Sequence, residues 1–129
     1  MSRYLLDTHS FLWYLNDDVR ISLRAKQTIN DPDNLIHISI ASLWEISIKV
    51  SLGKLSIPEP FTTFVSHQLV ENQFDILPIS VEHLSQVVEL PFIHRDPFDR
   101  LVIAQSIVED IPIIGQDQLM KQYGTSMIW

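Results

Sequence analysis

Acidic residues recur in this chain at or near the start of segments whose pattern is helical. Three of them follow an apolar run that predicts a buried strand. The acids at these positions are Asp7, Glu45, Asp99 and Asp117, with Asp96 one helical turn before Asp99. In an open α/β sheet, helix starts and the carboxyl ends of the strands share one edge, where ligands bind. Carboxylates that meet there require a divalent cation to balance their charge, and such a cation often acts on phosphate.

Three of these acids also have a purely structural interpretation. Asp7, Asp96 and Asp117 can each cap the helix that follows, which is a common use of Asp. Asp96 and Asp99 stand three residues apart, however, and like charges at this spacing lie about 5–6 Å apart and repel. A cation beside the pair would offset that repulsion. Because Ser and Asn cap helices about as well as Asp does, the repeated choice of carboxylates favours a metal site.

Glu45 has two structural alternatives of its own. It completes a Ser-x-x-Glu capping box that begins at Ser42, and it precedes Lys49 by four residues, the spacing of a surface ion pair on a helix. Its other neighbours are mostly apolar and leave little polar surface nearby. This composition favours a carboxylate that points into a lined cleft.

Arginines and histidines flank the proposed site. Arg95 and Arg100 stand on either side of the paired acids and are predicted to contact a substrate phosphate, with solvated ion pairs as the structural alternative. His9 and His94 lie close to the acids in sequence, but neither has the spacing to a second ligand that zinc sites show. We therefore predict that both histidines either lie on the surface or contact the metal ligands without binding the ion themselves.

The bulk properties restrict the class of protein. A length of 129 residues predicts a single domain, 1–129, and the lack of cysteine excludes disulfides and thiolate metal sites. No apolar run approaches the ~18 residues of a membrane span and no secretory signal is present, so we expect a soluble, cytoplasmic protein without a membrane partner. The net charge is −7, and residues 61–129 contain three basic and nine acidic residues. This acidity argues against a passive nucleic-acid-binding module, and only weakly against a nuclease that uses metal ions.

Apolar runs and helical patterns alternate along the chain. This alternation predicts a three-layer α/β/α fold with a central, mostly parallel sheet. The segment 97–109 has the clearest amphipathic spacing, and Pro78 must lie at the end or the edge of its strand. The predicted strands are 4–6, 35–38, 74–79, 112–114 and 126–129. The first predicted helix starts near residue 8 or 9 and includes the apolar residues of 11–15, and the later ones are 22–29, 40–52, 61–71, 81–89, 97–109 and 118–123.

Three strings of residues resemble the motifs of one known family. They are Leu5-Leu6-Asp7-Thr8-His9, the stretch from Ile38 to Ile46 that contains Glu45, and His94-Arg95-Asp96-Pro97-Phe98-Asp99-Arg100. The end of the chain, from Asp117 to Trp129, fits the same pattern. By these motifs the chain resembles PIN-domain toxins of the VapC type over essentially its full length.

The resemblance implies a PIN-like fold and a ribonuclease that depends on Mg²⁺, with Mn²⁺ as a possible substitute. It also implies a cognate antitoxin as partner and a homodimer. By motif position it assigns metal binding to Asp7, Glu45, Asp99 and Asp117, with Asp96 as an additional acid of this subgroup. Members of the family usually carry Thr or Ser two residues before the last acid, whereas this chain has Gly115, which suggests a tight turn near the site.

These observations together predict metal-assisted hydrolysis of RNA phosphodiester bonds. Bound Mg²⁺ would lower the pKa of a water molecule and stabilise negative charge on the attacked phosphate. The predicted catalytic residues are Asp7, Glu45 and Asp99, which bind metal together with Asp96 and Asp117. The predicted substrate contacts are Lys49, Arg95 and Arg100.

Two alternatives remain open at this point. A phospho-receiver domain has a similar length and layering and an acidic Mg²⁺ pocket, but it needs paired acids after the first strand and a late lysine outside a helix. Here Asp7 stands alone, and Lys121 falls within a predicted helix. A PIN-like domain that serves only as a binding partner has the same sequence pattern as a nuclease, so a cleavage assay is needed to distinguish the two.

Overall fold

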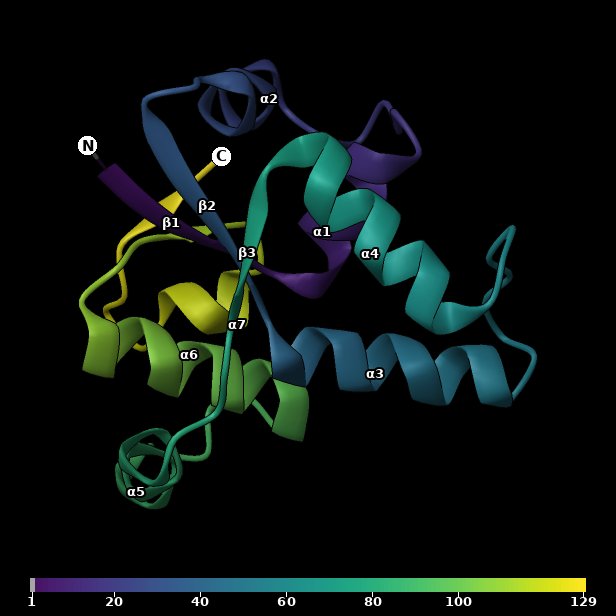
Figure 1. The fold of residues 1–129 in the computed structure, drawn as a ribbon. Coiled ribbons are helices and arrows are strands. Elements are labelled where there is room, and N and C mark those ends of the chain that lie inside the picture. Colours follow the sequence, from purple (N-terminus) through teal and green to yellow (C-terminus); the bar gives the residue numbers. More distant parts are fainter. Residues whose placement is uncertain (1) are drawn as a thin grey trace.

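Five short strands pair into one sheet (Figure 1). The computed structural model describes residues 2–129. The strands are β1 (Ser2–Leu6), β2 (Asn34–Ser39), β3 (Phe74–Leu77), β4 (Ile113–Ile114) and β5 (Met127–Ile128). Their order is β3-β2-β1-β4-β5, and every neighbouring pair is parallel. The first strand therefore lies at the centre of the sheet, with later strands on both sides.

Helices cover both faces of this sheet, which confirms the predicted α/β/α class. The helices are α1 (Thr8–Leu15), α2 (Leu23–Asn30), α3 (Ile40–Ser51), α4 (Phe61–Asn72), α5 (Val81–Glu89), α6 (Pro97–Glu109) and α7 (Gln118–Lys121). Figure 1 shows α1, α2 and α4 on one side of the sheet and α5, α6 and α7 on the other. The helix α3 continues directly from β2 and contacts both α1 and α6.

Two adjacent residues of β1 belong to two separate hydrophobic cores. Leu5 packs in one core with Val102 of α6, whereas Leu6 packs in the other with Phe11 of α1. Successive side chains of a strand point to opposite faces of the sheet, so neighbouring leucines reach different layers. Burying one such side chain contributes roughly 1.5–3 kcal/mol relative to leaving it exposed. The central strand is thus anchored from both faces.

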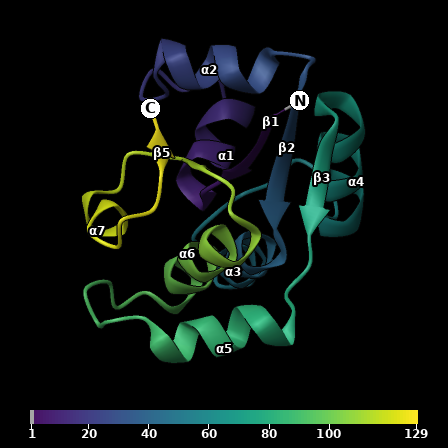
Figure 2. The same ribbon diagram turned by 90° about the vertical axis from the view of Figure 1, so that its left-hand side faces the viewer.

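The helix α6 is buried on nearly all sides, so the amphipathic pattern predicted for 97–109 was wrong. Its residues from Arg100 to Ser106 are all buried. The reason is an additional helix outside the layer that covers the sheet. The helix α5 packs along the outer side of α6 and separates it from solvent (Figure 2). The helix therefore lies between α5 and the sheet, and its start is held firmly in place.

Most predicted boundaries agree with the structure to within a few residues, and the differences have local causes. The strand predicted at 74–79 ends at Leu77, because Pro78 has no N–H group for the sheet. The first helix begins at Thr8, as its predicted start near residue 8 or 9 required, because Asp7 caps it. The last strand covers only Met127–Ile128 of the predicted 126–129.

Four helix starts lie along one edge of the sheet or close to it. The N-caps of these helices are Asp7 for α1, Ser39 for α3, Asp96 for α6 and Asp117 for α7. This is the carboxyl edge, at which open parallel sheets bind ligands. Within residues 2–129, no helix combines the length and the apolar character needed to cross a membrane.

Candidate metal centre

Asp7 follows the central strand and lies against Gly115 at the end of β4. Its Oδ1 atom accepts a hydrogen bond from the Ser10 backbone N–H at 2.8 Å, so Asp7 does cap α1. A Cβ atom on Gly115 would lie 2.5 Å from Oδ2 and 2.9 Å from Cγ of Asp7, so the carboxylate or the backbone would have to shift to make room for it. The φ angle of Gly115 is not in the left-handed region. Gly115 therefore serves a close approach of the carboxylate and not the tight turn that we predicted.

Asp96 and Asp117 also cap helices, as their structural interpretation required. Oδ1 of Asp96 accepts two backbone N–H groups at 2.8 and 3.1 Å, and Oδ1 of Asp117 accepts two at 2.8 and 3.2 Å. Each of these caps uses a single oxygen of its carboxylate. Capping and metal binding are therefore compatible, because the second oxygen of each carboxylate is not needed by the helix.

Glu45 lies in the second turn of α3 and is only 7% exposed. The capping-box interpretation was wrong, because Ser39 caps α3 and Ser42 instead accepts a hydrogen bond from the Thr8 hydroxyl at 2.8 Å. The predicted pair with Lys49 is present, with 3.0 Å between Nζ and Oε2. The other oxygen of Glu45, Oε1, is buried and has no hydrogen-bond partner within residues 2–129. A buried oxygen without a partner is costly, so Oε1 is suited to a ligand such as a metal ion.

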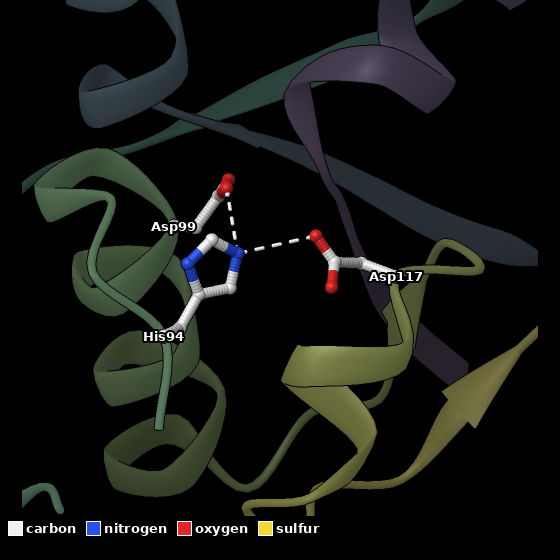
Figure 3. Close-up of side chains that lie close together, drawn as sticks. All are labelled: His94, Asp99 and Asp117. Carbon is white, nitrogen blue, oxygen red and sulfur yellow. Dashed lines mark hydrogen bonds and ion pairs between the residues drawn. The ribbon is translucent and has the colours of Figure 1, made fainter. Parts of the chain in front are cut away.

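A buried histidine lies between two of the acids (Figure 3). Nε2 of His94 is 3.1 Å from Oδ2 of Asp99 and 3.2 Å from Oδ2 of Asp117. Ligand atoms of these three residues lie within 4.8 Å of one another. Of the two predictions for His94, a surface position is wrong because the residue is 8% exposed, and the contact with Asp99 and Asp117 agrees with a residue that supports the metal ligands.

Burial and neighbouring negative charges raise the pKa of two carboxyl groups in this cluster, Asp99 and Asp7. The pKa of Asp99 is raised from 3.8 to about 7, mainly by burial and then by the negative charges of Asp96, Glu45 and Asp7, while the adjacent His94 opposes the rise. Burial likewise raises the pKa of Asp7, against hydrogen bonds from Ser10 that lower it. Carboxylates that are this crowded and desolvated favour a bound cation. Its positive charge would lower the pKa values that burial and neighbouring acids have raised.

A cleft of about 490 Å³ opens beside Asp7 and Asp117. Its wall includes Trp13, which contacts the His9 ring and carries the guanidinium of Arg20 4.9 Å above its own ring. Sequence analysis missed Arg20, because nothing in its local pattern relates it to the acids. A larger hollow, of about 590 Å³, lies near the starts of β2 and β3 and contains none of the predicted site residues. The carboxyl edge is the usual binding position, so we assign the site to the smaller cleft.

The three predicted substrate contacts have different environments. The side chain of Lys49 is 37% exposed beside Glu45, and Arg95 is exposed. Arg100 is only 6% exposed, and its guanidinium donates to main-chain carbonyl oxygens of the segment 87–94 at 2.9–3.4 Å. The predicted phosphate contact of Arg100 is therefore wrong, because its donors are already used to hold the chain before α6.

Comparison with known proteins extends this description to the level of family. Residues 4–125 match the family model of the PIN domain. The chain is 40% identical over 55 residues to Ribonuclease VapC16 of Mycobacterium tuberculosis. That match covers 43% of this chain and 38% of the relative, so it spans less than half the length of the curated protein.

Solved structures of similar shape extend over nearly the whole chain. The crystal structure of VapBC2 from Rickettsia felis, bound to a promoter DNA fragment, has a TM-score of 0.73 at 16% identity and covers 98% of this chain and 97% of its own. VapBC-5 from Mycobacterium tuberculosis has a TM-score of 0.60 at 15% identity, with 99% and 97% covered. FitAcB from Neisseria gonorrhoeae has a TM-score of 0.56 at 14% identity, with 98% and 96% covered. At these identities the likeness concerns the fold alone.

The family match decides between two of the classes that the sequence left open. The matched residues include both Asp7 and Asp117, and the match to the PIN domain decides against the phospho-receiver alternative. The fold of the chain is also similar to that of the solved neighbours. On these grounds the chain belongs to the PIN-domain family.

Proposed function

We propose that this chain is a divalent-metal-dependent endoribonuclease and the toxin of a toxin–antitoxin pair that acts in the cytoplasm. The observation that carries the proposal is the buried acidic cluster at the carboxyl edge of the sheet, in which the pKa of Asp99 is raised to about 7. Membership of the PIN-domain family and the partial match to a protein named as a ribonuclease support the same activity.

The donor set fits Mg²⁺ or Mn²⁺ better than a soft metal. Carboxylate oxygens predominate, and hard cations prefer oxygen ligands. Asp7, Glu45 and Asp99 would hold the ion, and Asp96 and Asp117 would complete the negative field around it. Glu45 contributes a buried Oε1 atom that the protein itself leaves without a partner in residues 2–129. When bound, the cation lowers the pKa of a water molecule and stabilises charge on the attacked phosphate.

The chain's own residues would bind and orient the RNA. Arg95 is exposed and Lys49 is half-buried beside Glu45, and we propose that both contact a backbone phosphate. Arg20 adds a cation on the wall of the cleft beside Asp7, although it also pairs with Asp18 at 2.7 Å. These cations offset the acidity of the chain locally, which a substrate with one charge per phosphate requires.

An antitoxin protein is the proposed partner. One of the solved neighbours is described as a member of the VapBC family of toxin-antitoxin systems, and this chain has the same fold. The excess of acidic residues in this chain suits a partner with a basic contact surface. We also propose a homodimer, as the resemblance to VapC toxins implies.

A cleavage assay with purified protein tests the activity. We expect RNA cleavage that requires Mg²⁺ or Mn²⁺, stops with a chelator and is lost in Asp99→Asn. A PIN-like domain that only binds would take up the metal with no cleavage of any RNA offered. Cleavage that persists unchanged in the chelator would contradict the proposed chemistry directly.

A further inference from the structure

His94 is held in place by the chain around it. Its backbone N–H donates to the Tyr123 hydroxyl at 2.7 Å, and its carbonyl oxygen lies 3.4 Å from the Arg100 guanidinium. Its ring Nδ1 accepts a hydrogen bond from the Asp96 backbone N–H at 3.2 Å. The residue is 8% exposed. The orientation of the ring is therefore set by the protein and does not depend on a ligand.

The contact with Asp96 also decides which ring nitrogen carries the proton. A neutral imidazole has one nitrogen that donates and one that accepts. Because Nδ1 accepts from the Asp96 N–H, the hydrogen-bond network assigns the proton to Nε2. An Nε2 atom that carries a proton has no lone pair to give to a metal ion. Its N–H group instead faces the oxygens of Asp99 and Asp117.

We propose that His94 is a positioning residue of the metal site, which joins Asp99 to Asp117 through Nε2–H and is not itself a metal ligand. The proposal rests on the metal-dependent activity proposed above. Asp99 belongs to α6 and Asp117 to the start of α7, and the histidine connects the two. Gly115, two residues before Asp117, has no side chain for this purpose. The spacing within 4.8 Å would otherwise suggest His94 as a third ligand, and the tautomer argues against that role.

The tautomer can be measured directly in the wild-type protein. We expect ¹⁵N NMR of the labelled protein to show His94 protonated on Nε2, and to show the same tautomer after saturation with Mg²⁺. The signal of His94 is identified among the five histidines of the chain as the one that is absent from the spectrum of His94→Gln. A proton on Nδ1, or loss of the Nε2 proton when Mg²⁺ binds, would overturn the proposal.

Metal affinity of two variants separates positioning from ligation. A Gln side chain places an N–H group near the position of Nε2, whereas Ala removes it. We expect His94→Ala to weaken Mg²⁺ and Co²⁺ binding by the same factor, about 10- to 100-fold, as is typical when a partner of a ligand is lost. His94→Gln should restore most of the affinity. A loss confined largely to Co²⁺ would identify a nitrogen ligand and overturn the proposal, because Co²⁺ gains more than Mg²⁺ from imidazole.

His83 provides the matched control. Its ring is also buried, its Nδ1 accepts a backbone N–H from Ser80, and its Nε2 lies 2.9 Å from a carboxylate oxygen of Glu109. His83→Ala should lower stability and leave the affinity for Mg²⁺ per folded molecule unchanged. An equal loss of affinity in His83→Ala would mean that His94→Ala acts through general loosening, which would contradict the proposal. Failure of the wild-type protein to bind Mg²⁺ would overturn the proposed function, while the metal-free NMR spectrum would still test the hydrogen bonds of His94.

Discussion

A buried histidine with the same hydrogen-bond arrangement lies near each end of α6, and the two differ in how many carboxylates surround them. At the end of the helix, His83 pairs with Glu109, and its neighbour Gln105 donates to the Pro78 carbonyl oxygen. At the start of the helix, a second buried histidine, His94, meets two carboxylates, with three more acids nearby. In both cases Nδ1 accepts a backbone N–H and Nε2 faces acid.

The difference between the two ends shows how a structural device can be adapted to a binding site. The His83 cluster contains a single carboxylate, and its polar atoms find partners within the fold, so it needs nothing from outside. The cluster around Asp99 has more acid than the protein can neutralise, and Oε1 of Glu45 remains without a partner in residues 2–129. The first arrangement stabilises the chain, and the second sacrifices stability for the ability to bind a cation.

The largest expected difference between the two ends is in catalysis. Asp99→Asn should reduce RNA cleavage by more than about 100-fold, beyond the 10- to 100-fold that losing a partner of a ligand typically costs. Glu109→Gln should leave the rate near that of the wild type, because Glu109 lies at the opposite end of α6. Initial cleavage rates at saturating Mg²⁺ measure both. A wild-type rate in Asp99→Asn would remove Asp99 from the mechanism.

Metal binding should stabilise the protein only through the carboxylates at the start of α6, and not through Glu109 at its end. At a metal concentration of 100 times Kd, binding to the native state adds about 2.7 kcal/mol to the free energy of unfolding. Thermal unfolding with and without Mg²⁺ should therefore show a clear rise in Tm for the wild type and for Glu109→Gln. Asp99→Asn should show little rise. An equal rise in all three proteins would place the ion somewhere else.

The close contact between Gly115 and Asp7 allows a test of the geometry of the acidic cluster. Gly115→Ala should destabilise the metal-free protein by about 1–3 kcal/mol, the usual cost of overpacking, because the new Cβ would meet the Asp7 carboxylate. Combining it with Asp7→Ala should recover most of that loss. Gly53→Ala is the control, since a Cβ there meets no atom within 4 Å and only its φ of +71° is unfavourable. Denaturant unfolding of the set would show no coupling if Asp7 and Gly115 were not in contact.

The pH dependence of the metal-free protein should differ between variants of the two ends. A carboxyl group whose pKa is raised on folding binds its proton more tightly in the native state. The free energy of unfolding therefore falls as pH rises from about 4 through about 7, the range over which the pKa of Asp99 is shifted. The contribution should be on the order of 1–2 kcal/mol after solvent screening. Denaturation curves across this range should retain the slope in Glu109→Gln and lose most of it in Asp99→Asn.

Much of the fold could be predicted because strands and helices alternate in a simple pattern. The strand order could not, since pairing of β1 with both β2 and β4 depends on contacts far apart in sequence. The burial of α6 was missed for a related reason. Its outer face is covered by α5, and the sequence of one helix does not indicate that another helix will cover its outer face. The apolar spacing therefore gave the correct element and the wrong environment.

The acids of the site were predictable because helix starts in a parallel sheet share one edge. The buried positions of His94 and Arg100 were not, since both depend on the loop before α6 folding back onto Tyr123 and the helix. A charged residue beside an acidic motif reads as a surface group until that loop is placed. The antitoxin partner and the homodimer stay predictions from the resemblance.

The most direct test of the whole account is the position of a bound ion. A crystal soaked in Mn²⁺ should give an anomalous difference peak within coordination distance of the carboxylates of Asp7 and Asp99, with the ring of His94 outside that distance. Absence of a peak there, at a Mn²⁺ concentration that supports RNA cleavage in solution, would contradict the claim that these carboxylates form a metal centre.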